Sequence, residues 1–582
     1  MGWCVTGRNI VLKLKGRSLP ALVLGFLLCL LYSIIFSGQM LGILGLYRPW
    51  AAIPLTVLVF AVSGFFYLRS LPVADGPAPA FAKLDLFFGL CAVALTLVIV
   101  AVPLVLWPAS PAGKTLTWDA GLFQFPKAVE LFRSGSIWNM NICYAEYPLG
   151  YESLLSFSML FGGGTALFGP VHFVLALFLI AALWLLAKRH TNLPSGLLLL
   201  AIVTFLLYGF LNKDNNPWWI YEPLLFTVGK NDLMQGAAVL AVLAFAPLMA
   251  ARDEKFEWNP VGFALASMVA FSIKPNSLII LPLWLLAFYY QWKASPTRAD
   301  FFKRALVMVA VALPGLLWIP RNLLAQGALF TGASLKLTAW SIAANLTNPS
   351  LYKYIPVYLY FFLALTGVAV ILSILRQRIT LAAALTLVVL LVGFAVTPAS
   401  AFHGNNQERA EIAWRFAVAF ISYALLLILV FAAPLLKKLI DLLSRYRLAL
   451  FVLAFGALLL SGFFVWRMRQ LVRSVPENAG ILRDQFEKPV GTDGYFSAYD
   501  YTRKNIHNST IIVDNGLPFY AYDAGFTNTT ACSGHADTFV VFNTDWDKGD
   551  PGEYPDYIKT DGWEKDWQVV YEDSYSRIYQ RR

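Results

Sequence analysis

One carboxylate in this chain could do chemistry at a membrane surface. Asp119 lies in the run Thr117-Trp118-Asp119-Ala120, just past an apolar stretch. A single acidic residue is unusual at such a place, and Trp118 and Phe123 give it an apolar setting. There it could take a proton from an acceptor that lies beside a lipid-borne donor. The sequence therefore predicts Asp119 as a catalytic base.

A second group of polar residues accompanies Asp119 in the loops expected on the same side. Glu146 and Tyr147 open the step EYPLGY, which leads back into apolar sequence. Glu146 or Asp232 could assist Asp119, although Asp232 could instead cap a helix N-terminus. His403 lies in a later loop of this kind. Together these four residues, Glu146, Tyr147, Asp232 and His403, are a possible acceptor or donor site. Lys and Arg near the ends of apolar stretches often only snorkel to the interface, but together they would suit a phosphate.

Composition identifies the kind of protein that carries these residues. The 582 residues are 58% hydrophobic and 14% charged, with a mean hydropathy of +0.62. Soluble domains are about 45–50% apolar and about 25% charged. The net charge of +11 comes from basic residues scattered between apolar stretches, which are topology signals and not a nucleic-acid-binding stripe. We expect an integral membrane protein whose partner is the lipid bilayer, with no nucleic acid partner.

Thirteen apolar stretches have a length that can cross a bilayer. They are 19–36, 50–68, 84–107, 169–187, 194–211, 232–250, 259–273, 275–291, 305–319, 354–375, 380–397, 416–434 and 448–466. Two of them meet at Lys274-Pro275-Asn276, so a single kinked segment is the alternative there. The run 147–168 carries Pro148 and several glycines, and we expect an outer-surface helix there. The fold class is thus an α-helical polytopic membrane protein with about 13 transmembrane helices.

Loop charges set the orientation. With the N-terminus in the cytoplasm, the inner loops are short and basic, as the positive-inside rule requires. The C-terminus then lies outside. The expected domains are 1–83 with two added spans, a transmembrane core 84–466 with its first outer loop at 108–168, and an extracytoplasmic domain 467–582.

The tail has the pattern of a small soluble α/β domain. A helix is predicted over Tyr499–His507, and short buried strands over Thr510–Asp514 and Phe539–Phe542. The segments Gln568–Tyr571 and Arg577–Tyr579 predict a terminal hairpin. No catalytic pattern accompanies them, so we expect a structural or acceptor-guiding role.

Two of the five cysteines, Cys143 and Cys532, fall on the predicted outer side. They could pair if the tail folds over the first outer loop, since the outer compartment is oxidising if it is a periplasm. A disulfide needs Cα atoms within about 7 Å, and nothing in the sequence fixes that distance. We therefore expect free thiols.

The order of the motifs resembles the GT-C superfamily of membrane glycosyltransferases, especially the branch of the protein O-mannosyltransferases and the aminoarabinose lipid A transferase. WDAGLFQFPKAVELFRSG resembles the family's first outer loop, in which an Asp is catalytic. Later family motifs are resembled, in order, by EYPLGYESLL, VGKNDLMQGAAVLAVLAF, FSIKPNSLIILPLWLL, WIPRNLLAQG and AWRFAVAF. The resemblance runs from about Leu84 onward and includes the soluble tail.

The resemblance implies an inverting glycosyltransferase. It would move a sugar from a polyprenyl-phosphate donor to a hydroxyl of a protein, lipid or glycan acceptor, with Asp119 as the base. The basic residues that would bind the donor phosphate and offset its charge are Lys230, Lys274, Arg321 and Arg415. Many members carry paired acids, but Ala120 and Gly121 follow Asp119 here. We therefore expect no cofactor and metal-independent chemistry, although a divalent cation could bind if Glu146 or Asp232 joined Asp119.

Two other functions stay open. A transporter or flippase for a lipid-linked sugar should show inverted repeats and polar residues near the bilayer midplane, and the sequence shows neither. A non-catalytic partner subunit of the same fold is the other alternative, and the presence of Asp119 argues against it. The expected location is a bacterial inner membrane, with the C-terminal domain in the periplasm.

The predicted orientation can be tested by cysteine-accessibility labelling in intact cells. A cysteine introduced near residue 255 should be protected from a membrane-impermeant reagent, whereas one near residue 540 should react. Labelling at 255 or protection at 540 would contradict the topology.

Overall fold

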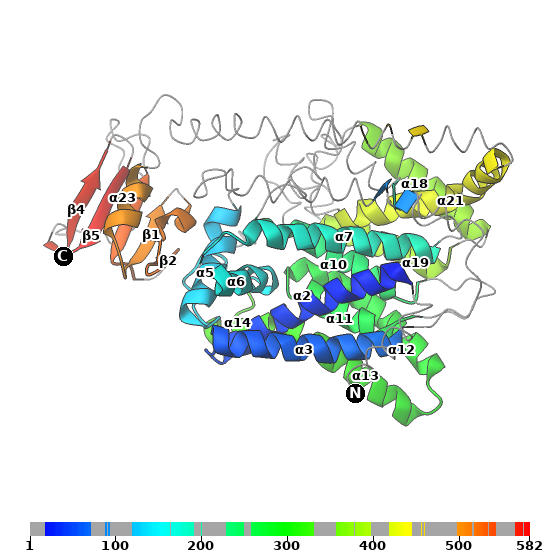
Figure 1. The fold of residues 1–582 in the computed structure, drawn as a ribbon, viewed down its shortest axis with the longest axis horizontal. Coiled ribbons are helices and arrows are strands. Elements are labelled where there is room, and N and C mark those ends of the chain that lie inside the picture. Colours follow the sequence, from blue (N-terminus) through cyan, green and yellow to red (C-terminus); the bar gives the residue numbers. More distant parts are fainter. Residues whose placement is uncertain are drawn as a thin grey trace, which may run out of the picture.

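The computed structural model describes a bundle of helices and a small C-terminal sheet (Figure 1). The described residues are 18–71, 88–89, 91–92, 119–162, 164–190, 199–200, 229–248, 258–330, 357–376, 379–396, 418–444, 455–456, 459, 462, 497–514, 517–532, 535–542, 565–573 and 576–582. The helices before the sheet are α2 (Leu19–Ile43), α3 (Pro49–Ser70), η2 (Ala120–Gln124), α5 (Phe125–Ser134), α6 (Gly150–Gly162), α7 (Phe168–His190), α10 (Asp232–Phe245), α11 (Pro260–Phe271), η4 (Pro275–Ile280), α12 (Leu281–Ala294), α13 (Arg298–Ala312), η5 (Leu313–Leu316), α14 (Trp318–Gln326), α18 (Val357–Leu375), α19 (Leu381–Val396) and α21 (Val418–Ser444).

Four described helices, α2, α3, α7 and α21, are long and apolar enough to cross a membrane. A fifth span results if α13 and η5 continue into α14 across a bend of 47°. Each predicted span that falls on described residues contains a helix, which confirms the helical, membrane-embedded class. The predicted spans 84–107, 194–211 and 448–466 lie outside the described residues apart from isolated positions, so the count of thirteen stays a prediction. The domain limits at 83 and 466 likewise stay predictions.

The polar break at Lys274 separates two helices, α11 and α12. Helix α11 ends at Phe271, and the 3-10 turn η4 begins at Pro275, which cannot continue a helix ladder. Phe263 and Trp284 stand on opposite sides of the break, and their ring centroids are 5.2 Å apart. A single kinked segment would hold these rings far apart. The chain therefore forms two separate helices here, and the prediction that each crosses the membrane stays a prediction.

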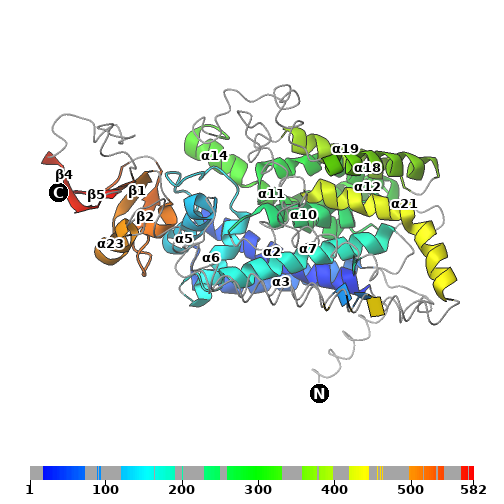
Figure 2. The same cartoon turned by 90° about the horizontal axis from the view of Figure 1, so that it is seen from above.

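Helix α10 lies at the centre of the bundle, where it packs against α7, α11 and α21 (Figure 2). All of its residues are buried. Small residues permit this close packing, since a Cβ at Gly236 would lie 2.8 Å from the side chain of Val418. The surrounding helices therefore fix the position of Asp232 in its first turn.

Basic helix ends gather at the end of the bundle that lies away from the sheet. The ring of Tyr67, near the end of α3, lies 5.8 Å from that of Phe245 at the end of α10. Arg189, near the end of α7, donates a hydrogen bond to the carbonyl of Ala244. Arg69 belongs to the same last turn of α3. The helix ends that the sequence assigns to inner loops thus lie together.

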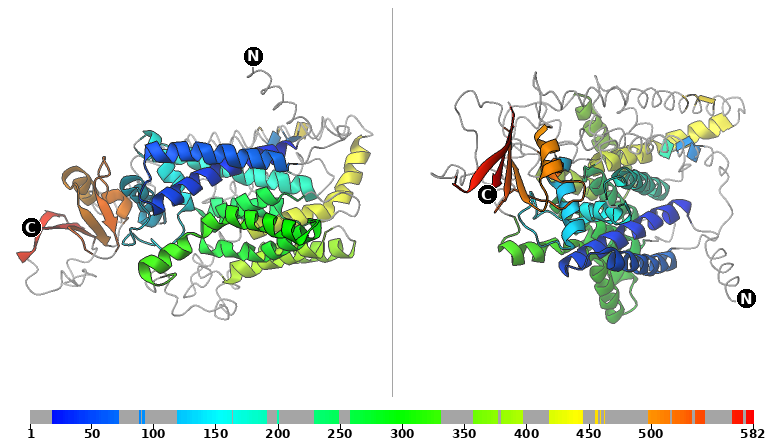
Figure 3. Two further views of the ribbon diagram at one scale, coloured as in Figure 1. Left: turned by 90° about the horizontal axis from the view of Figure 1, so that it is seen from below. Right: turned by 60° about the vertical axis from the view of Figure 1, so that its left-hand side comes forward.

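The first outer loop lies at the opposite end, between the bundle and the sheet (Figure 3). The backbone N–H of Ile137 donates to the carbonyl of Gly42 at 3.1 Å, and the indole of Trp138 donates to that of Ile43 at 2.8 Å. These bonds attach the loop to the end of α2. Helix α6, with 13 residues, is about 20 Å long and too short for a core of about 30 Å. It is the short helix expected within 147–168.

The C-terminal region forms a five-stranded sheet with the order β2-β1-β3-β5-β4. Its elements are α23 (Ser497–Asn505), β1 (Thr510–Asp514), η9 (Pro518–Ala521), β2 (Thr529–Ala531), β3 (Thr538–Phe542), β4 (Trp567–Glu572) and β5 (Ser576–Arg581). Strand β1 pairs in parallel with β2 and β3, and β5 pairs antiparallel with β3 and β4. The predicted helix, strands and hairpin are confirmed. The sequence analysis missed β2, which has only three residues.

The expectation of free thiols at Cys143 and Cys532 is wrong. The two residues form a disulfide, with Cα atoms 5.1 Å apart and a sequence separation of 389. The backbone N–H of Cys532 also donates to the carbonyl of Asn141 at 2.8 Å. The tail therefore folds over the first outer loop. That contact brings the two Cα atoms within the distance that a disulfide needs, which the sequence alone did not determine.

A buried carboxylate holds the turn between η9 and β2. Asp523 accepts hydrogen bonds from the backbone N–H groups of Gly525, Thr527 and Asn528 at 3.3, 2.7 and 3.0 Å. Burial raises the pKa of Asp523, but these donors outweigh burial and lower it. The carboxylate thus stabilises the turn in its ionised form.

Replacing Asp523 should therefore destabilise the sheet domain in a pH-dependent way. We expect Asp523→Ala to cost about 1–3 kcal/mol, because several backbone donors lose their acceptor. Because the folded pKa is lowered, the stabilisation is complete above the ordinary carboxyl pKa of about 4 and is lost as pH falls through the folded value. Hydrogen exchange of the turn over a pH series measures this, and the exposed Asp566→Ala should change little. Equal exchange in both variants would contradict the assignment.

Candidate active site

Asp119 stands at the start of the first outer helix, partly buried. It precedes the π-helical turn η2, which continues directly into α5. Such turns are rare and often occur at functional sites. Gly121 within the turn lies against Leu517 of the C-terminal domain, and a Cβ there would come within 2.9 Å of it. Packing from the tail therefore helps to hold the segment that carries Asp119.

Two tyrosines lie near enough to Asp119 to feel its charge. Tyr144 lies with its ring centroid 4.8 Å from Phe123 and 5.4 Å from Tyr147. Burial raises the pKa of both tyrosines, and the negative charge of Asp119 raises it further. The hydroxyls thus stay protonated near the carboxylate, as neutral hydrogen-bonding groups beside flat apolar faces. Such a combination of apolar rings and a few polar groups is typical of small-molecule sites.

Lys230 lies next to the helix of Asp119. The preceding residue, Gly229, has φ +98°, and a Cβ there would lie 2.3 Å from Ala120. Only glycine tolerates both the backbone conformation and the close approach. The Gly229 N–H also donates to the hydroxyl of Tyr151 at 3.0 Å. The predicted base and the first predicted phosphate ligand therefore belong to touching segments.

Lys274 forms an ion pair with Asp232. Both side chains are largely buried, with exposures of 13% and 2%. The backbone brings this pair close to the first outer loop, since the Gly150 N–H donates to the carbonyl of Ser272 at 2.7 Å. Asp232 offsets part of the charge of Lys274, which the sequence analysis did not foresee.

Arg321 and Asn322 hold the backbone of the segment that carries the tyrosines. The guanidinium of Arg321 donates to the carbonyl of Ala145 at 2.5 Å and of Tyr147 at 3.4 Å. The amide of Asn322 donates to the carbonyl of Glu146 at 2.7 Å. Arg321 also lines a small pocket together with Lys127 and Glu130. The binding of a phosphate by Arg321 stays a prediction. Its hydrogen bonds to this backbone show a second role, which is to hold the segment of the tyrosines in place.

The remaining predicted residues divide into two cases. Glu146 is buried, and its Oε1 has no hydrogen-bond partner within the described part of the chain. It stands between Ala145 and Tyr147, in the segment that Arg321 holds. Arg415 and His403 lie outside the described residues, so the predicted convergence of Arg321 with Arg415 is untested.

The structure adds a buried ion pair that the sequence analysis did not identify. Lys127 of α5 and Glu152 of α6 are 2.8 Å apart, and their side chains are 2% and 1% exposed. Burial lowers the pKa of Lys127 and raises that of Glu152, while the charge of each opposes this shift in the other. The sequence did contain a signal for this pair, since Glu152 is an acid within the apolar run of the predicted outer-surface helix. The pair fixes α5, and with it η2, against α6.

No group of three His, Cys, Asp or Glu side chains that could hold a metal occurs among the residues that the structure describes. This leaves the metal requirement untested, because a donor phosphate or the residues outside the described ranges could complete a site.

Fold and site together define a polytopic membrane protein with a carboxylate site between its bundle and an α/β domain. No protein-family model matches the sequence, and no curated protein matches it either. Among solved structures, the chain is similar to ArnT from Cupriavidus metallidurans bound to undecaprenyl phosphate, with 14% sequence identity and a TM-score of 0.46. The match covers 86% of this chain and 98% of that chain.

Removing one partner of the buried pair should be far more damaging than removing both. We expect Glu152→Gln to destabilise the protein by about 3–5 kcal/mol, because the Lys127 ammonium is left buried without a countercharge. Replacing both, as Lys127→Met with Glu152→Leu, should be close to neutral. Thermal unfolding of the purified protein measures both effects.

Arg133→Gln provides the matched control, since Arg133 pairs with Glu130 at 2.9 Å but is one-third exposed. We expect a change of at most about 1 kcal/mol there. Equal stability of wild type and Glu152→Gln would show that the pair does not hold α5.

Proposed function

We propose that the protein is an inverting glycosyltransferase that uses a polyprenyl-phosphate sugar as donor. The observation that carries the proposal is the place of Asp119. It is a partly buried carboxylate near Tyr144 and Tyr147, in a segment that touches the one bearing Lys230. A base can activate the acceptor and a cation can stabilise the leaving phosphate, and the aromatic rings offer a flat surface beside them.

In the proposed reaction, an acceptor hydroxyl attacks the anomeric carbon from the side opposite the phosphate. The new C–O bond forms as the bond to the phosphate oxygen breaks, and its electron pair leaves with the polyprenyl phosphate. The acceptor proton passes to Asp119. A single displacement inverts the anomeric carbon, and one positioned base suffices for it.

The basic residues would stabilise the leaving group. Lys230, Lys274 and Arg321 lie at the same end of the bundle, and we place Arg415 with them by sequence. Asp232 reduces the net charge next to Lys274, and the carbonyl of Ala145 accepts a hydrogen bond from Arg321. We propose that these cations replace a metal ion in offsetting the phosphate charge.

The proposed site faces the outer side of a bacterial inner membrane. The gathering of basic helix ends at the far end of the bundle supports this orientation, because basic loops stay in the cytoplasm. The disulfide supports it as well, since disulfides persist in oxidising compartments.

The charge distribution favours an enzyme over a transporter or flippase. A transporter carries polar groups near the bilayer midplane. The buried Asp, Glu, Lys and Arg side chains of the described helical region are Lys127, Glu130, Glu146, Glu152, Asp232 and Arg321. All belong to the first outer loop or to elements that contact it, so they gather at one end of the bundle.

Replacing the proposed base should abolish transfer. We expect Asp119→Asn to lower turnover by roughly a hundredfold to ten-thousandfold, because the amide cannot accept the proton. Binding of the polyprenyl phosphate should be nearly unchanged. The assay follows the transfer of labelled sugar from a polyprenyl-phosphate donor in vesicles to a panel of hydroxyl acceptors.

Asp300→Asn is the matched control. Asp300 lies in the first turn of α13, where its carboxylate accepts a hydrogen bond from the hydroxyl of the N-cap residue Thr297 at 2.8 Å. Near-normal turnover of Asp119→Asn would refute the role of the base. Wild-type protein that moves the lipid across the bilayer without transfer would favour the flippase. A wild type that does neither would favour a partner subunit.

A further inference from the structure

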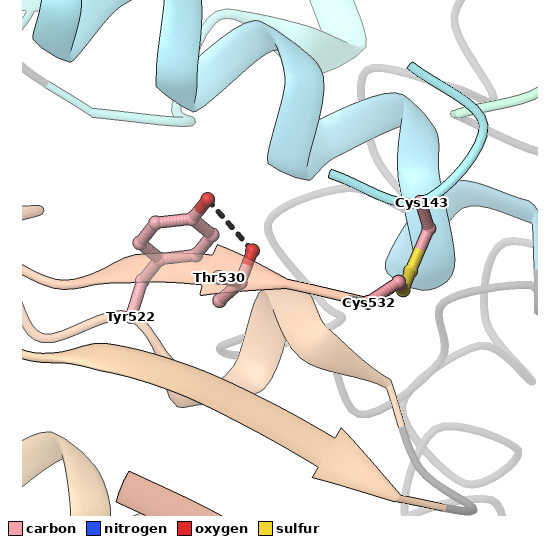
Figure 4. Close-up of a disulfide and its surroundings, with 4 residues drawn as sticks. All are labelled: Cys143, Tyr522, Thr530 and Cys532. Atoms are coloured by element: carbon pink, nitrogen blue, oxygen red, sulfur yellow. Dashed lines mark hydrogen bonds between the residues drawn. A yellow bond between two sulfur atoms is a disulfide. The ribbon is translucent and has the colours of Figure 1, made fainter. Parts of the chain in front are cut away.

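The C-terminal domain is joined to the loop that carries the site tyrosines. We call residues 141–147 the tyrosine loop. Cys143 of this loop forms the disulfide with Cys532, and the Cys532 N–H donates to the carbonyl of Asn141 at 2.8 Å. Figure 4 shows the bond joining the outer loop to the end of a strand of the sheet. Tyr144 is the next residue in the chain, so the covalent link lies directly beside a side chain of the candidate site.

The same domain also contacts the helix that begins at Asp119. The rings of Phe519 and Phe125 have centroids 5.0 Å apart. The hydroxyl of Tyr522 donates to the carbonyl of Pro126 at 3.4 Å. The domain therefore touches both parts of the site, the segment of the base and the tyrosine loop, and can fix one relative to the other.

The backbone beside the disulfide is in a conformation that needs support. Tyr144 has φ +53°, in the left-handed region, where a bulky non-glycine residue is rare. Such a residue persists only when its surroundings hold it there. The disulfide at Cys143 is one such constraint, and the hydrogen bonds of Arg321 to Ala145 and Tyr147 are a second. The N–H of Tyr147 also donates to the carbonyl of Tyr144 at 3.1 Å. Loss of either of the first two should allow Tyr144 to relax.

We propose that Cys143 and Cys532 are positioning residues, whose disulfide holds Tyr144 and Tyr147 against Asp119 and makes turnover depend on the redox state of the bond. The inference rests on the proposed function for its catalytic consequence only. Reduction by a dithiol breaks the S–S bond with two electrons and two protons. It yields two cysteine thiols and the cyclic disulfide of the reductant.

Reduction should affect turnover more than donor binding. Two of the predicted phosphate ligands, Lys230 and Lys274, lie on other segments. The third described one, Arg321, contacts the tyrosine loop but belongs to helix α14. Misplacing a group of the site by about 1 Å can cost a hundredfold in rate. We therefore expect kcat to fall by roughly tenfold to a hundredfold, with little change in the affinity for undecaprenyl phosphate.

The test compares Cys143→Ser, Cys532→Ser and the double variant with the wild type, before and after treatment with a dithiol. If the bond is the cause, all three variants lose kcat to the same extent, and the dithiol lowers the wild type to their level. The double variant should not respond to the dithiol. Cys29→Ala is the control, since Cys29 is a free, buried cysteine of α2, and it should keep both the activity and the response.

Hydrogen exchange gives a readout that does not depend on activity. Amides of 141–147 should exchange faster in the reduced wild type, while those of α10 stay protected. The reduced wild type serves where a variant fails to fold. Equal exchange and equal kcat in both redox states would overturn the proposal. If the oxidised wild type shows no transfer but its loop loosens on reduction, the glycosyltransferase assignment fails while the positioning role stands.

Discussion

The site depends on how a buried stretch of backbone without regular structure satisfies its carbonyl groups. Residues between Cys143 and Gly150 have no helix or sheet ladder, so buried carbonyls there need donors from elsewhere. Arg321 and Asn322 supply them to three successive residues. A guanidinium is suited to this because it presents several donors in one plane. The loop that faces Asp119 is therefore shaped by a helix almost two hundred residues later in the chain.

The two buried ion pairs differ in how far they are removed from water, and their roles differ accordingly. Lys127 and Glu152 are fully enclosed and neutralise each other, so they serve as a fixed support between α5 and α6. Asp232 and Lys274 form the same kind of pair, but the lysine keeps some exposure. Lys274 is therefore more accessible to an anion, with 13% of its side chain exposed against 2% for Lys127. The degree of burial, more than the residue type, distinguishes the ion pair that supports the fold from the lysine that is a candidate binding group.

Local patterns predicted what local interactions determine. Apolar runs marked the helices, Pro275 marked the reversal after α11, and alternating residues marked β1, β3 and the terminal hairpin. Contacts between distant segments were not predictable in the same way. The turn η2 depends on Leu517 packing against Gly121, and the disulfide depends on a sheet that folds back over the first outer loop. Asp119 could be singled out because an isolated acid in an apolar setting is itself a local signal. The role of Glu152 could not be predicted in this way, because it depends on the ion pair with Lys127, which lies in another helix.

The shortness of α10 has a consequence for which donors could be used. Helix α10 has 14 residues and its neighbour α7 has 23, so α10 is about 13 Å shorter, and Arg189 ties the two together near their C-terminal ends. The end of α10 that carries Asp232 and the paired Lys274 therefore lies further into the bundle than the Phe168 end of α7. For the proposed glycosyltransferase, this depth would favour a phosphate anchored on a membrane lipid, because a freely dissolved nucleotide sugar would have to give up water to reach it.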